Sequence, residues 1–329
     1  MRRPTAFEWN WVILGGLPLA LPIILLLGEQ RLAVASPISL YFWMSTLISA
    51  PHVYSTYLRL GRKIHEGQVP TWIGWPAYLA CAAALAVATL GARYAEAMTA
   101  VNVVQSFHYV RQGYGVSRLY TRDAGDDALG TRLLFLAFHL AMPLFVIGRW
   151  HNLWLVWKGA RSQYIIPVGF PAPVLAACWA LAGVGLLAGI AGEGRRWWRQ
   201  GRSYRPLGVA LLAIFYAIHT YGFLSVTSYQ RGFFAVTIFH AVQYLALLWM
   251  LEREQASAAV RWVATLVRGA FGLVPFWGAI TLVVLGFEWR VLPVLDRWVW
   301  VSMSSVLLGA MSAHHYAADA MIWRARAGR

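Results

Sequence analysis

The stretch "FPAPVLAACWALAGVGLLAGIA", residues 170–191, contains no charged side chain and is followed at once by the basic segment "GEGRRWWRQGR", residues 192–202. A helix needs about 20 consecutive, mostly apolar residues to cross the hydrocarbon core of a bilayer. Arginine side chains and tryptophan rings are typical of the membrane–water interface. The stretch therefore predicts a membrane-spanning helix that ends at an interface.

The rest of the chain has the same character. Of its 329 residues, 59% are hydrophobic and only 12% are charged, whereas soluble domains are about 25% charged. No linker or clear repeat divides it, so we expect one domain, residues 1–329. The prediction is an all-α polytopic membrane helix bundle of about ten transmembrane helices. The expected spans lie near 10–28, 37–58, 71–92, 97–118, 131–148, 170–191, 206–226, 232–251, 268–287 and 298–320.

The basic residues predict the orientation. With ten spans, both termini lie on one side, and that side holds most of the Lys and Arg, which favours the cytoplasm. We therefore expect an integral protein of the cell inner membrane with cytoplasmic termini. An alternative for the first helix is a cleaved signal, because "MRR", an apolar run and "AVAS" at 33–36 resemble one. Glu29 and Arg31 precede that site, which favours a retained helix.

Charge and cysteine content exclude two classes of function. The formal net charge of +15 is spread over short loops between apolar segments, where basic side chains orient helices and contact anionic lipids. No soluble segment is long enough for a nucleic-acid-binding domain. Cys81 and Cys178 lie in apolar runs without CxxC spacing, which indicates neither a disulfide framework nor a thiolate metal site.

Histidines inside the predicted spans are the main functional signal. Ionisable groups are rare and costly within a membrane, and they mark functional sites by default. Histidines fall in the cytoplasmic half, or near mid-depth, of four helices that are all predicted to run in the same direction. If those helices are neighbours, their side chains meet in one layer. The predicted metal ligands are His52, His108, His240, His314, His315 and Asp319.

Each of these helices also carries polar groups three or four residues from its histidine, on the same face. Lipid cannot satisfy such groups, so they must point toward one another or toward a wet cavity. We expect Thr56, Gln112 and Gln243 to be outer partners of the ligands. Tyr244, beside His240, and Arg111, beside His108, are the predicted catalytic side chains.

The donor set indicates a metal. Imidazoles and a carboxylate suit iron, zinc, copper or manganese. Five histidines and one aspartate exceed the need of a single tetrahedral zinc, so the predicted cofactor is non-haem iron, as two ions. Zinc, copper and haem b are alternatives. A single membrane histidine can instead be an interhelical hydrogen-bond partner. This structural role is expected for His139 and is left open for His219.

The "HHY" at 314–316 and the array of intramembrane histidines resemble, in the logic of the site, the integral-membrane histidine-box oxygenases and desaturases. Those enzymes use clustered histidines near the cytoplasmic face to hold two irons that activate dioxygen. The resemblance covers few residues, because the histidines here are spread singly over separate helices. It implies an oxygenase, hydroxylase or desaturase of lipid metabolism that acts on a lipid-soluble substrate.

An external electron donor is expected because the chain has no motif for binding a redox cofactor of its own. It has no dinucleotide-binding glycine motif, so electrons would come from a separate donor such as a ferredoxin-like protein, docked on the arginine-rich face. Anionic lipids are the other expected partners. Two functions remain as alternatives: a b-type haem or quinone-linked electron carrier, and a transporter or structural subunit of a membrane complex.

Overall fold

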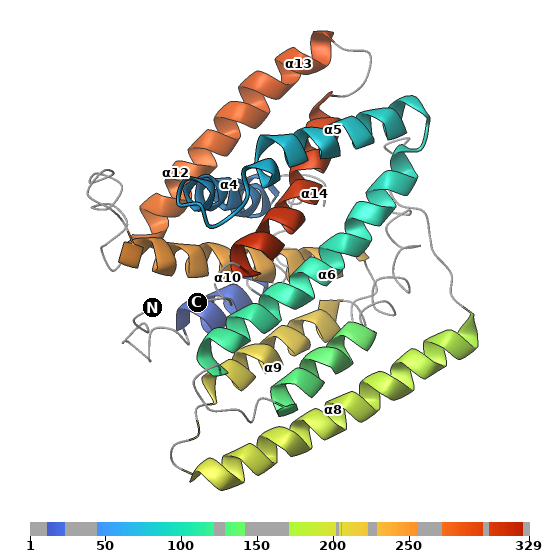
Figure 1. The fold of residues 1–329 in the computed structure, drawn as a ribbon, viewed down its shortest axis with the longest axis vertical. Coiled ribbons are helices and arrows are strands. Elements are labelled where there is room, and N and C mark those ends of the chain that lie inside the picture. Colours follow the sequence, from blue (N-terminus) through green and yellow to red (C-terminus); the bar gives the residue numbers. More distant parts are fainter. Residues whose placement is uncertain are drawn as a thin grey trace. The chain divides into compact units, whose positions relative to one another are not determined.

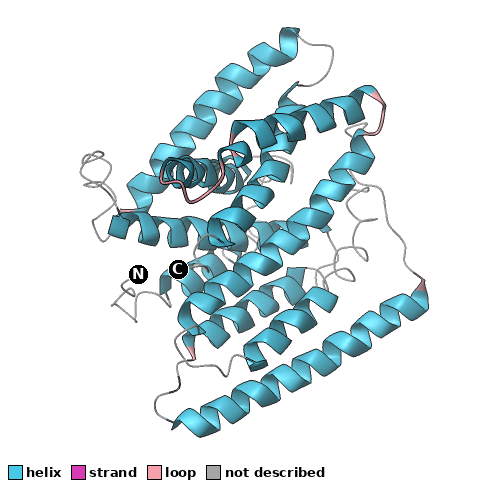
Figure 2. Ribbon diagram, in the orientation of Figure 1, coloured by secondary structure: helices cyan, strands magenta, loops and turns pink. Residues whose placement is uncertain are grey.

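A computed structural model describes residues 12–23, 45–121, 129–141, 171–201, 204, 206–222, 229–255, 272–298 and 303–324. These residues form helices joined by short turns, and no strand occurs among them (Figures 1 and 2). The predicted all-α class is confirmed for this part of the chain.

Three helical segments are long and apolar enough to cross a membrane, namely Thr71–Leu90, Ala172–Gln200 and Leu273–Val294. They correspond to the predicted spans 71–92, 170–191 and 268–287. The first consists of a short 3₁₀ turn, η3 (Thr71–Ile73), and α5 (Trp75–Leu90); the second is α8. Membrane association is thus supported by three helices.

The predicted count of ten spans is not confirmed. Among the described residues, the apolar helices Leu14–Ile23, Leu129–Ala141, Leu207–Thr220 and Ala235–Met250 are shorter than a full span. The helix over the predicted span 97–118, α6 (Tyr94–Thr121), is long but polar, which keeps it out of the three. The chain termini and the segment 33–36 lie outside the described residues, so their topology stays a prediction.

Contacts divide the chain into two compact units, whose boundaries fall within α6 and α10 (Tyr229–Gln255). One unit comprises Met1–Val101 with Thr237–Arg329, and the other comprises Asn102–Val236. We call them the first unit and the second unit. The single-domain prediction for 1–329 stays a prediction.

In the first unit, α14 (Met303–Arg324) packs against α5 and α4 (Ala50–His65). The approach to α5 is close because α14 has a glycine there: a Cβ on Gly309 would lie 3.0 Å from the Leu85 side chain. Helix α12 (Leu273–Gly286) also packs on α4 and is followed by the π-helical turn η8 (Phe287–Val291) and α13 (Leu292–Trp298). Two further π-helical turns are η1 (Val12–Gly16) and η2 (Ser45–Ser49).

In the second unit, α8 (Ala172–Gln200) lies beside the Leu129–Ala141 helix and α9 (Leu207–Thr220) (Figure 1). Glycines allow the first of these contacts. A Cβ on Gly189 would lie 2.6 Å from the Leu134 side chain, and one on Gly192 would lie 2.8 Å from the Gly130 Cα. Small residues that let two backbones approach closely are typical of helix pairs in membranes.

Candidate metal centre

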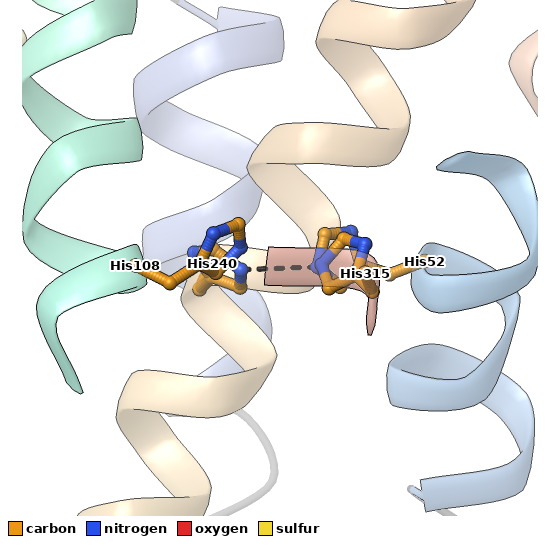
Figure 3. A group of neighbouring side chains, drawn as sticks. All are labelled: His52, His108, His240 and His315. Carbon is orange, nitrogen blue, oxygen red and sulfur yellow. Dashed lines mark hydrogen bonds between the residues drawn. The ribbon is translucent and has the colours of Figure 1, made fainter. Parts of the chain in front are cut away.

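Three helices of the first unit each bring one histidine to a common point. His52 lies in the first turn of α4, His240 in the middle of α10 and His315 in the middle of α14. All three are buried, with exposed fractions of 4%, 1% and 0%. Figure 3 labels them together with His108 and marks the contacts that His52 makes with His240 and His315. The predicted convergence of these three side chains is confirmed.

The three rings meet through the same atom. The Nε2 of His52 lies 3.0 Å from the Nε2 of His240 and 3.0 Å from the Nε2 of His315. The His52 ring stands nearly perpendicular to both others, at interplanar angles of 89° and 88°. No two of the ring nitrogens that can act as ligands here are more than 4.8 Å apart.

Hydrogen bonds alone do not account for this arrangement. An imidazole nitrogen carries either one N–H or one lone pair, directed in the plane of the ring. The Nε2 of His52 can therefore form a good hydrogen bond with one neighbouring nitrogen but not with both. A cation between the rings resolves the conflict because all three lone pairs can point at it. The geometry thus fits a metal ion.

One helical turn beyond each histidine, a side-chain oxygen lies on the same face. Thr56, Tyr244 and Asp319 form this second layer, and all three are buried. The Tyr244 hydroxyl donates to Asp319 Oδ1 at 2.8 Å, and Thr56 Oγ1 donates to the same oxygen at 3.3 Å. Thr56 Oγ1 and the Tyr244 hydroxyl are 2.8 Å apart. The oxygen layer is therefore internally hydrogen-bonded.

The two layers are connected through Asp319 and Tyr244. Asp319 Oδ2 lies 3.9 Å from His315 Nε2, and the Tyr244 ring packs edge-on against His52 with centroids 4.3 Å apart. On α4, α10 and α14 alike, the residue of the oxygen layer follows the histidine by four positions.

A buried arginine, Arg59, adds a positive charge to the region of Asp319. Arg59, seven residues after His52 on α4, is 1% exposed and interacts favourably with the Asp319 carboxylate. Arg59 is not among the site residues predicted from the sequence. The spacing of His52, Thr56 and Arg59 at i, i+4 and i+7 on one helical face is the signal that could have found it.

His314, predicted as a ligand, is placed elsewhere. Its Nε2 lies 2.5 Å from the Ile73 carbonyl oxygen, which can only accept, so this nitrogen is the donor. Its Nδ1 then accepts from the Tyr57 hydroxyl at 3.0 Å. Both ring nitrogens are occupied, and His314 is not one of the converging histidines. Adjacent residues on a helix point about 100° apart, so His314 and His315 face different neighbours.

Other predicted partners also have different contacts. Gln243 donates from Nε2 to the Leu14 carbonyl at 3.0 Å and so fixes η1 against α10. Arg111, predicted as catalytic, is exposed on α6 in the second unit, which does not suit a role in a buried site. His139 bonds through Nδ1 to the Phe135 carbonyl one turn earlier, in line with its expected structural role.

His108 and Gln112 belong to the second unit, where both are buried on α6. Their predicted membership of the metal site stays a prediction. His219 is buried on α9 and bonds through Nδ1 to the Phe215 carbonyl at 2.8 Å, an intrahelical contact.

No protein-family model, curated protein or solved structure matches this chain. The geometry of the site is therefore the basis for the function proposed below.

Proposed function

We propose that the protein is a membrane-associated metalloprotein in which His52, His240 and His315 bind one metal ion. The observation that carries this proposal is that two imidazole nitrogens lie 3.0 Å from the Nε2 of a third, inside a buried site. Asp319, the only carboxylate in contact with these rings among the described residues, contributes negative charge at the edge of the site.

The donor set favours some metals over others. Imidazoles with one nearby carboxylate and no thiolate suit iron, zinc, copper or manganese, and histidine and carboxylate ligands with open positions are typical of non-haem iron. We propose a single non-haem iron, and a second ion would need donors beyond these three rings.

The spacing of the three rings argues against haem. Axial ligands lie on opposite faces of the haem iron, with nitrogens about 4 Å apart and the macrocycle between them. Here the His52 ring touches both other rings at centroid distances of 4.7 and 4.6 Å. This packing leaves no room for a porphyrin between them.

For the reaction, we propose oxidation of a lipid-soluble substrate by an oxygenase, hydroxylase or desaturase. A non-haem iron supplies dioxygen and one-electron chemistry that amino-acid side chains lack. The buried histidines and the apolar helices around them would keep water from the reacting centre. Tyr244 can hold a proton at its hydroxyl and return it through Asp319, to which it is hydrogen-bonded. An external electron donor would supply reducing equivalents.

Two measurements on detergent-purified protein test this function. Metal analysis should find about one iron per chain in the wild type and in His139→Ala, and much less in His52→Ala. Oxygen uptake with a ferredoxin-type donor and a lipid extract should depend on the donor and disappear in His52→Ala. Equal metal content in wild type and His52→Ala would refute the metal centre. Metal binding without donor-dependent oxygen uptake would leave the centre in place and refute the oxygenase.

A further inference from the structure

An apolar groove of about 590 Å³ lies in the second unit. This volume is within the roughly 300–1,000 Å³ of typical ligand sites. The lining combines Leu134, Leu186, Ile190 and apolar side chains of α9 with Glu193 of α8, the one charged side chain among the described residues that line it. The groove is thus an apolar site that contains a carboxylate.

Glu193 lies at one end of this groove. The hydroxyl of Tyr204, three residues before α9, bonds to Glu193, so the first turn of α9, with Val209, is near this carboxylate. The lining then follows α9 to Tyr221, which corresponds to about 18 Å from Val209 at 1.5 Å per residue. On α8, the lining extends back from Glu193 to Leu186. The groove is therefore elongated, with its carboxylate at one end and apolar side chains along its length.

The groove has the same polarity as an amphiphile in a bilayer. Helix α8 is one of the three candidate membrane spans, and Glu193 follows directly after its uncharged stretch and one glycine. Trp197, one turn later, is 64% exposed, which is typical of the membrane–water interface. Leu186 and Ile190 lie within the uncharged stretch and are exposed. The polar end of the groove is thus at the interface, and its apolar part is open along the span.

Glu193 is buried, and its charge is balanced within the second unit. Its Oε2 lies 3.2 Å from Nη2 of the buried Arg196 and accepts from the Tyr204 hydroxyl at 3.2 Å. Its Oε1 accepts from Thr131 at 2.5 Å, the one donor to this oxygen among the described residues. A carboxylate oxygen can accept about two hydrogen bonds. Oε1 therefore has capacity for one further donor, at a place that carries no net charge.

We propose that the groove binds a neutral long-chain alcohol from the lipid phase. The hydroxyl donates to Glu193 Oε1, and the hydrocarbon chain lies along α8 and α9 toward Tyr221. The hydroxyl uses the acceptor capacity that Thr131 leaves open, and the apolar lining takes the place of the lipid tails around the chain. This site goes beyond the proposed metal function and does not depend on it.

Charge favours an alcohol over other amphiphiles. A fatty acid would place its carboxylate against the Glu193 carboxylate, and like charges in contact repel each other. An amine would add a positive charge beside Glu193, whose charge Arg196 already balances. An unbalanced charge in an apolar groove is costly, whereas a hydroxyl needs only a hydrogen-bond partner.

The first experiment compares ligands on the full-length protein in detergent. Competition with radiolabelled hexadecanol measures the affinities of hexadecanol, its methyl ether, and palmitate at a pH where palmitate is ionised. A hydrogen bond to a charged acceptor contributes about 10-fold or more in affinity. Hexadecanol should therefore bind at least about 10-fold more tightly than the ether, and palmitate should bind more weakly than hexadecanol. Equal affinities of hexadecanol and the ether, or palmitate binding as tight as that of hexadecanol, would overturn the neutral alcohol.

The second experiment tests the anchor with Glu193→Gln. Because Arg196 only donates, the glutamine carbonyl should face Arg196 and the NH₂ group should replace Oε1. An NH₂ group can donate to an alcohol and to an ether alike, so the advantage of hexadecanol over the ether should disappear. Glu96→Gln, which changes a surface glutamate paired with Arg93 in the first unit, is the matched control and should keep the advantage. An unchanged advantage in Glu193→Gln would overturn Glu193 as the anchor.

The third experiment tests the chain site. Ala213→Phe places a ring in the groove and should weaken binding of hexadecanol and the ether, whereas Ala188→Phe, on α8 outside the lining, should not. Circular dichroism and gel filtration show which variants fold, and the ligand comparison on the wild type decides the alcohol assignment even if Glu193→Gln does not fold. Wild-type affinity for hexadecanol in folded Ala213→Phe would overturn the groove as the binding site.

Discussion

Two adjacent histidines on α14 provide the sharpest test of the metal centre, because they differ in what they contact. His315 directs Nε2 to within 3.0 Å of His52 Nε2. His314 uses both ring nitrogens to hold Tyr57 and the Ile73 carbonyl. Substitution of either by alanine removes the same side chain from neighbouring positions of one helix. The expected consequences are opposite.

His315→Ala should lose metal and keep most of its stability. Loss of a side chain that merely orients a ligand weakens metal binding by about 10–100-fold, so loss of one of three direct ligands should exceed about 100-fold. His314→Ala should keep its metal but unfold more easily. The buried Ile73 carbonyl loses its donor, which costs about 1–3 kcal/mol, and the lost packing against Tyr57 adds to this.

Both effects are measured on the same samples. Metal per chain and metal affinity come from elemental analysis and chelator competition, and stability comes from unfolding in mixed detergent micelles. The reasoning is refuted if the two variants bind equal metal, or if His314→Ala loses metal while His315→Ala retains it. In the second case the sequence-based assignment of His314 as a ligand would be right.

Three further predictions concern other parts of the chain. Thr56→Val preserves the side-chain shape but removes a donor to Asp319, and we expect metal affinity to fall by about 10–100-fold; an unchanged affinity in chelator competition would show that the oxygen layer does not support the metal. Gly189→Leu should destabilise the second unit by about 1–3 kcal/mol through overpacking, whereas Gly183→Leu, with open space around its Cβ, should not; equal thermal midpoints would contradict this. His108→Ala tests the ligand role that the sequence predicts for His108: lower metal content by elemental analysis would add it to the three proposed ligands, and unchanged content would restrict the centre to the first unit.

Much of the candidate site could be predicted because helical periodicity relates nearby residues. The sequence analysis paired His240 with Tyr244 and His315 with Asp319 at i, i+4, and the structure places both pairs on the same side of their helices. Helical periodicity does not decide whether the residue three positions or the residue four positions after a histidine contacts the other helices. On α4, Ser55 and Thr56 lie three and four residues after His52. Ser55 Oγ donates to the His52 backbone carbonyl at 2.6 Å, a local contact, and only Thr56 reaches Asp319.

The sequence could not predict which residues far apart along the chain contact one another. His314 and His315 both satisfy the criteria for a ligand, and the choice between them depends on which groups of neighbouring segments each ring reaches. His315 reaches His52 of α4, whereas His314 reaches the Tyr57 hydroxyl of the same helix and the Ile73 carbonyl of η3. The predicted count of ten spans is not confirmed for the described residues, and the boundaries of the helices are the reason. Apolar composition extends through helices of 10–17 residues, such as α9, and does not by itself fix where a helix ends.

The imidazole layer and the oxygen layer differ in whether their contacts can be satisfied without a bound ion. In the oxygen layer, the two hydroxyl protons can be placed without conflict, because Thr56 can donate to the Tyr244 hydroxyl while Tyr244 donates to Asp319 Oδ1. Both hydroxyl donors of this layer are therefore satisfied within the protein. In the imidazole layer, the contacts of His52 compete for one nitrogen, so the layer is complete only when a cation lies between the rings. Burial makes such a conflict costly, which is the physical reason to regard the imidazole layer as the binding site and the oxygen layer as its support.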